Sequence, residues 1–190
     1  MITGLFDAFA PPEFIDARSP MNDEARAIID RLQLEPLPHE GGFFRRTWSS
    51  TTTLQNGRAA GGAIYFLLTE TDFSALHLLQ TDELWLFHAG DPVEHVQLLE
   101  TESHPVVTIL GTDLVHNHAP QVVVRGRSWQ GARLRAGQRD VTSQSALNGW
   151  ALLSCIMAPE WNEREFTLGT PAKLLKLFPF AGSWIHALTR

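Results

Sequence analysis

The sequence predicts a single all-β domain, built as a sandwich or a closed barrel. From residue 63 onward, short runs rich in Val, Ile, Leu, Phe, Trp and Thr alternate with turn segments. Many short strands without interleaved helices are typical of these architectures. The 190 residues suffice for one well-formed core and are few for two. The expected strands cover residues 63–69, 74–79, 83–88, 93–99, 106–110, 121–124, 132–135, 150–157 and 166–168.

Two helices are expected to flank the strands. Residues 22–34 place apolar side chains on one helical face, with Asn22 as a cap and with Pro36 and Pro38 ending the helix. A short helix over residues 171–177 follows the strands, with Pro171 at its first position. Residues 1–20 are rich in proline and show no clean period, so we expect an irregular arm there and one domain over residues 21–190.

Composition excludes several classes of partner. The formal net charge is −6, and the basic residues are scattered, which disfavours nucleic acid binding. No apolar run is long enough to span a membrane, and the N-terminus does not have the pattern of a signal peptide, so we expect a soluble, cytoplasmic protein. Cys155 is the single cysteine, which rules out an internal disulfide, and its apolar flanks indicate a buried, inert thiol.

The segment with most chemical information is residues 74–92. Strand side chains alternate, so His77 and Leu79 share one face of their strand, and Glu83, Trp85 and Phe87 share one face of the next. If both faces point inward, His77 and Glu83 meet inside the barrel above an aromatic floor, which is typical of a ligand site. The alternative is an exposed His–Glu pair on a hairpin.

This segment resembles the first motif of the cupin superfamily, in which His-x-His is followed by Glu and then by Gly at fixed spacing. His77, Glu83 and Gly90 match that pattern, and Leu79 stands at the second His position. The sequence of the surrounding segments resembles the Cupin_5 branch of compact single-domain cupins, over roughly residues 27–179. The segments that carry this likeness are 39–47, 81–85, 89–92, 129–132, 149–150 and 158–159. The resemblance implies a jelly-roll barrel, also called a double-stranded β-helix, and a homodimer.

Metal cupins use four ligands, and the resemblance places Trp129 at the fourth position. Neither Leu79 nor an indole nitrogen binds a metal, so we expect no metal and no cofactor. His116 and His118 form a His-x-His pair in a polar loop, where exposed surface residues are the simpler interpretation.

Around the mouth, we predict that His39, Arg45, Trp85, Trp129 and Gln130 bind the ligand. Arg45 is the candidate for an anionic group, Trp85 and Trp129 for a planar ring or a sugar face, and a surface salt bridge or core filling are the alternatives. Arg46 and residues 124–127 depart from the branch, and make the expected mouth more basic.

Three functions remain open. His77 is the expected base, and Glu83 the supporting carboxylate, of a metal-independent isomerase, epimerase or lyase acting on a sugar-like or carbonyl metabolite. A non-catalytic metabolite-binding protein and a metal-dependent dioxygenase are the alternatives. A homodimer is also expected, because the strand over residues 63–68 is apolar on both faces and needs cover on each.

Overall fold

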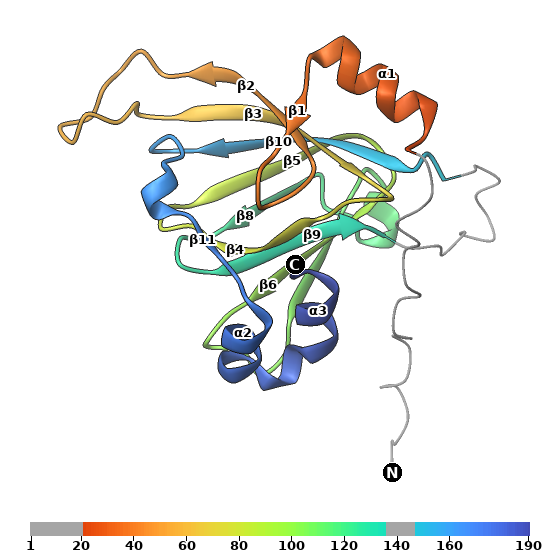
Figure 1. Ribbon diagram of the computed structural model, residues 1–190, viewed down its shortest axis with the longest axis vertical. Coiled ribbons are helices and arrows are strands. Elements are labelled where there is room, and N and C mark those ends of the chain that lie inside the picture. Colours follow the sequence, from red (N-terminus) through yellow and green to blue (C-terminus); the bar gives the residue numbers. More distant parts are fainter. Residues whose placement is uncertain (1–20, 136–146) are drawn as a thin grey trace.

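The computed structural model describes residues 21–135 and 147–190, and two antiparallel sheets face each other in it (Figure 1). The expected arm over residues 1–20 lies outside the described residues. The first sheet runs in the order β1 (Glu35–Pro36), β2 (Phe43–Ser49), β3 (Gly62–Thr69), β10 (Trp150–Met157), β5 (Glu83–Gly90) and β8 (Gln121–Val124). The second runs in the order β11 (Thr167–Leu168), β4 (Ser74–Leu78), β9 (Trp129–Leu134), β6 (Val93–Leu98) and β7 (Val106–Leu110). The predicted all-β jelly roll is confirmed.

The core between the sheets forms around Trp85. Inward-facing side chains from β3, β5, β6, β7 and β10 pack here, as the alternation of strand side chains requires. The Phe66 ring meets the Trp85 indole edge to face, with 5.5 Å between the ring centroids. Trp85 is fully buried, so it is the floor under the barrel mouth that the strand alternation predicts.

Helix α1 (Asp23–Leu32) lies over the outer face of the first sheet (Figure 1). Asn22 caps it, with its side-chain oxygen accepting the backbone N–H of Ala25. The helix ends earlier than predicted, because Gln33 takes a left-handed conformation (φ 53°) before the prolines are reached. Its apolar face covers Leu67 and Trp150. Leu67 and Tyr65 on the outer face of β3 are therefore covered within the chain, and the homodimer stays a prediction.

The C-terminal helices cover the outer face of the second sheet. They are α2 (Pro171–Leu177), the 3-10 turn η3 (Pro179–Ala181) and α3 (Gly182–Ala187). Leu174, Ile185 and Leu188 pack there against Leu76 and Trp129. Helix α2 has the predicted bounds and has Pro171 at its start, whereas α3 was not predicted. Two further 3-10 turns, η1 (Leu114–His116) and η2 (Glu163–Glu165), lie in loops. None of the described helices is long and apolar enough to cross a membrane.

Candidate functional site

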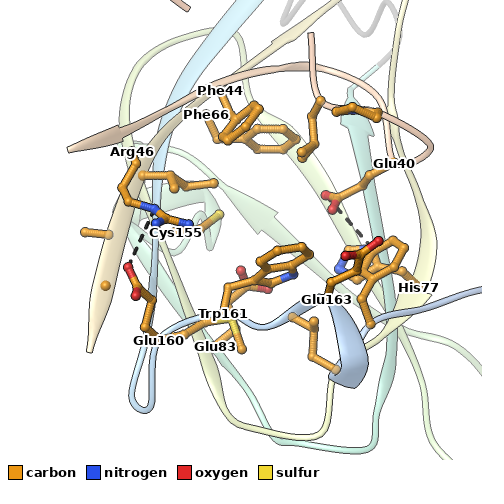
Figure 2. Close-up of a pocket in the computed structure, with 18 of the residues that line it drawn as sticks. Glu40, Phe44, Arg46, Phe66, His77, Glu83, Cys155, Glu160, Trp161 and Glu163 are labelled. Carbon is orange, nitrogen blue, oxygen red and sulfur yellow. Dashed lines mark ion pairs between the residues drawn. The ribbon is translucent and has the colours of Figure 1, made fainter. Parts of the chain in front are cut away.

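A cavity of about 360 Å³ opens between the two sheets. Its wall comes from the loop before β2, from strands β2 to β5, from β10 and from the segment around η2 (Figure 2). Most of the lining is apolar or aromatic, and a few ionisable side chains converge in it. Such a composition is typical of a small-molecule site.

His77 projects into this cavity from β4. Its side chain is only 1% exposed, and its Nδ1 lies 2.8 Å from the carbonyl oxygen of Ala75. Because a carbonyl oxygen only accepts hydrogen bonds, we assign the proton of the neutral ring to Nδ1. The ring stacks on Phe166, with 5.4 Å between centroids and 24° between planes. The imidazole is thus held in one orientation, and Nε2 is the nitrogen that keeps a free lone pair.

Glu83 lies at the start of β5 and lines the same cavity. Its Oε2 accepts hydrogen bonds from Trp85 Nε1 at 3.0 Å and from Gln130 Nε2 at 2.6 Å. Burial raises the pKa of this carboxyl from its ordinary value of 4.5 to about 7, while the nearby His77 opposes the shift and Glu40 adds to it. Glu83 therefore exists in both protonation states near neutral pH.

Gln130 on β9 connects Glu83 to a second buried histidine. Its amide oxygen accepts a hydrogen bond from Trp85 Nε1 at 3.1 Å and lies 3.2 Å from His95 Nε2. Burial lowers the pKa of His95 to about 4, so this histidine is neutral at physiological pH and donates from Nε2. The network positions the Glu83 carboxyl and leaves His77 outside it.

Glu40 is a site residue that the sequence analysis missed. Its Oε1 lies 4.0 Å from His77 Nδ1 and accepts a hydrogen bond from Ser74 Oγ at 2.7 Å (Figure 2). His39, Gly41 and Gly42 all have positive φ, and this turn brings Glu40 over the cavity. The two glycines after Glu40 were the available signal, but we assigned the ligand contact to His39. His39 also lines the cavity and is exposed.

The Glu40 loop is anchored from the far end of the chain. The Arg190 guanidinium donates to the Asp72 carboxylate and, at 3.0 Å, to the carbonyl oxygen of Phe73. Asp72 in turn accepts the backbone N–H of Gly42 at 2.8 Å. A Cβ on Gly41 would collide with the carbonyl oxygen of Phe73 at 2.4 Å, so this close packing requires glycine. Arg190 thus holds in place the turn that carries Glu40.

Replacing Arg190 with alanine is expected to loosen that turn. The Arg190–Asp72 pair is partly exposed, so we expect the free energy of unfolding to fall by only about 1 kcal/mol. Amide hydrogen exchange in residues 37–42 should instead rise by about fivefold, because the opening is local. Hydrogen exchange followed by mass spectrometry measures the rate in residues 37–42, and chemical denaturation measures the free energy of unfolding. Arg190→Lys, which keeps the charge, should give an exchange rate between those of the wild type and Arg190→Ala. Unchanged exchange in residues 37–42 of Arg190→Ala would contradict the role assigned to Arg190.

Comparisons with known proteins agree with this geometry. The family model described as Cupin superfamily (DUF985), Cupin_5, matches residues 26–169. The chain belongs to the cupin superfamily. A hypothetical protein from Leishmania major superposes with a TM-score of 0.78 at 30% identity, over 87% of this chain and 98% of that one. A protein from Shewanella oneidensis superposes with a TM-score of 0.77 at 27% identity, over 90% of this chain and 99% of that one. A cupin-2 domain from Rhodospirillum rubrum superposes with a TM-score of 0.51 at 14% identity, over 83% of this chain and 91% of that one. At this identity the similarity shows the fold alone. No curated protein matches the sequence significantly.

In this cupin, the aromatic and basic residues predicted for the mouth lie elsewhere. Trp129 packs in the outer cluster against α2, with Lys173 Nζ 4.9 Å from its ring, because Gln130 and not Trp129 faces inward on β9. Trp85 is core. Arg45 lies 5.8 Å from the Tyr65 ring in the layer under α1, and its neighbour Arg46 lines the cavity instead. Among the five predicted ligand-binding residues, His39 lines the cavity and Gln130 lies directly behind Glu83.

The expected basic mouth is also corrected. Four carboxylates line the cavity, from Glu40, Glu83, Glu160 and Glu163, against one guanidinium, from Arg46. Arg125, one of the basic departures from the branch, pairs with Asp82 at 2.6 Å. His116 is exposed on η1 with its Nδ1 2.6 Å from Asp113, as expected of a surface loop.

A four-ligand cupin metal site does not fit these residues. Leu79 lines the cavity where a second histidine would be required. The inward-facing fourth position is Gln130, whose amide oxygen is already engaged by Trp85 and His95. Within residues 21–135 and 147–190, no group of three or more His, Cys, Asp and Glu side chains is arranged to hold a metal ion. Cys155 lines the cavity as a buried thiol, and burial raises its pKa well above the ordinary value.

Proposed function

We propose that this cupin binds a small carbonyl-containing metabolite and moves a proton on it, as a metal-independent isomerase, epimerase or lyase. The observation that carries the proposal is His77, a buried imidazole with its Nδ1 held by the Ala75 carbonyl and its Nε2 left as a base at the cavity wall. General bases of this kind work best when oriented by a second group and surrounded by apolar walls. The fixed ring and the aromatic lining meet both conditions.

The chemical step follows from the two carboxylates beside the imidazole. Nε2 takes the proton from a carbon next to the substrate carbonyl, and the C–H electron pair moves into a carbon–carbon double bond while the carbonyl oxygen becomes an enolate. The imidazolium that forms is stabilised by Glu40, 4.0 Å from Nδ1. If the proton returns to the opposite face of the same carbon, the product is an epimer. If it returns to the adjacent carbon, the product is an isomer, and if a β-substituent leaves instead, the product is an alkene.

The role of Glu83 differs from the one expected. It accepts hydrogen bonds from Trp85 and Gln130, so it does not support His77 by direct hydrogen bonding. With its pKa raised to about 7, its protonated form is present at neutral pH as an acid facing the cavity. An acid next to a base is what enolisation requires, because the carbonyl oxygen gains charge as the carbon loses its proton.

Solvent deuterium exchange tests the proposal whatever the product of the reaction is. The protein is incubated in D₂O with dihydroxyacetone, glyceraldehyde, fructose and galactose, and loss of the hydrogen next to the carbonyl is followed by proton NMR. We expect exchange with at least one compound, lowered by about 10² to 10⁴-fold in His77→Gln. The matched control is His104→Gln, at an exposed histidine, which should exchange as the wild type does. Equal exchange in His77→Gln, or none in the wild type with saturating binding, would favour the non-catalytic alternative.

A further inference from the structure

The charges around the cavity are unbalanced. Of the four lining carboxylates, Glu160 is paired with Arg46, whose Nε lies 3.6 Å from Oε1. Figure 2 shows this pair on one side of the cavity and the Glu40–His77 contact on the other. The single lining guanidinium is thus already engaged, and lies away from the histidine.

Three other carboxylates line the cavity, from Glu40, Glu83 and Glu163. Among the described residues, none of the three forms an ion pair with a lysine or an arginine. The Glu40 side chain is 13% exposed and Glu83 is 7% exposed, so both are largely out of water. A charge that is removed from water without a partner is unfavourable, and a cation that enters the cavity would relieve that cost.

A second observation points to a ligand at the same place. His77 is 1% exposed and lines the cavity, yet its Nε2 has no hydrogen-bond partner among the described residues. A polar atom of a cavity-lining side chain that has no protein partner normally has a bound molecule or water as its partner. Glu40 lies next to this histidine, with its Oε1 4.0 Å from Nδ1, and Glu163 lines the same cavity (Figure 2). A bound ligand would face Nε2 with the carbon that loses its proton and would have its ammonium group beside the carboxylates.

The walls of the cavity also suit a cation. Trp161 and Phe166 both line it, with their ring centroids 6.5 Å apart and 57° between their planes. The faces of aromatic rings attract ammonium groups. An anion would be repelled by the three carboxylates and would find the Arg46 guanidinium already paired with Glu160.

We propose that the ligand of this cavity carries an ammonium group, held at the His77 side by the Glu40 and Glu163 carboxylates against the Trp161 and Phe166 rings. This deepens the proposed function and rests on the part of it that makes the cavity a small-molecule site. If the cavity also carries out the proposed proton transfer, a preference for an ammonium group makes amino ketones and amino sugars better substrates than phosphorylated or carboxylated compounds. The order of preference is therefore cation, then neutral compound, then anion.

Isothermal titration with three compounds of one skeleton tests this order. The probes are 2-phenylethylamine, 2-phenylethanol and 3-phenylpropanoate, at about pH 7.5 and low salt, where the amine and acid probes are both charged. We expect the amine to bind about tenfold more tightly than the alcohol, and the acid not to bind. Glu40→Gln and Glu163→Gln should each weaken amine binding by about fivefold and leave alcohol binding unchanged. Glu102→Gln, at an exposed position in the turn after β6, is the matched control.

Each other outcome overturns the ammonium proposal. If the alcohol or the acid binds as tightly as the amine, the preference for a cation is contradicted. The cavity would then still be a ligand site. Amine binding that neither substitution weakens would place the cation elsewhere, and no saturation by the amine up to about 10 mM would remove this ligand class. The proposed proton transfer fails separately, if the amine binds as expected and no amino sugar or amino ketone exchanges deuterium next to its carbonyl.

Discussion

Trp85→Ala is expected to lower the free energy of unfolding by about 3 to 5 kcal/mol, because it empties the middle of the core. Trp85 is 1% exposed, packs edge to face on Phe66 at 5.5 Å and on His95 at 5.0 Å, and donates to Glu83 and Gln130. The substitution therefore leaves a cavity and also removes the donor on which two buried acceptors depend. Chemical denaturation followed by circular dichroism measures the change.

Two further variants separate the packing from the hydrogen bond. Trp85→Phe keeps most of the ring but lacks the N–H, and should cost about 1 to 3 kcal/mol. Trp48→Ala removes a tryptophan that is 50% exposed on β2, and should change stability by less than about 1 kcal/mol. If Trp85→Ala were as mild as Trp48→Ala, the central position of Trp85 in the core would be wrong.

Glu83→Gln is expected to change how stability depends on pH. In the folded protein, the pKa of Glu83 is raised from 4.5 to about 7, so between these values the folded state binds more protons than the unfolded state. The free energy of unfolding that Glu83 contributes is thus complete below pH 4.5 and is lost as the pH rises to about 7, by about 3 kcal/mol in all. Glutamine keeps an acceptor for Trp85 and Gln130 but has no charge, so this loss should disappear.

His95 has the opposite effect in an overlapping range. Burial lowers its pKa from 6.5 to about 4, so the unfolded state binds the extra proton, and the free energy of unfolding rises between these pH values. In the wild type the two effects largely cancel between about pH 4.5 and pH 6.5. Glu83→Gln should therefore reveal a rise in stability through that range, which urea denaturation at steps of pH measures. Parallel pH profiles for the variant and the wild type would show that Glu83 is not the buried carboxyl described.

Much of the barrel could be predicted because its signals are local. The strands β7, β8 and β10 and the helix α2 have the bounds that their residues indicated, since apolar runs and turn residues mark both ends. The convergence of His77 and Glu83 also followed from alternation along two neighbouring strands. The strand β2 was not predicted, because its residues Phe43–Ser49 are only partly buried and show no alternation of apolar and polar side chains.

Two of the errors at the site, Arg45 and Trp129, have one physical origin. A strand has two faces, and a shift by one residue exchanges them. Arg45 and Trp129 were assigned to the cavity, whereas Arg46 and Gln130 are the neighbours that face the interior. The pairing of β2 with β3 and of β9 with β4 decides this, and both pairings contain register shifts that depend on the partner strand.

The sequence by itself determined an all-β sandwich or barrel with inward-facing His77 and Glu83, and its resemblance to the cupin first motif implied the jelly roll and placed Leu79 at a ligand position. The inward direction of the two side chains follows from the period of two, which connects residue number to strand face. Only the tertiary structure decided that Glu40 faces His77, that Gln130 holds Glu83, and that the cavity is acidic. Each of these features joins residues far apart in the chain, because the charge and burial of a site depend on every strand and loop that surrounds it.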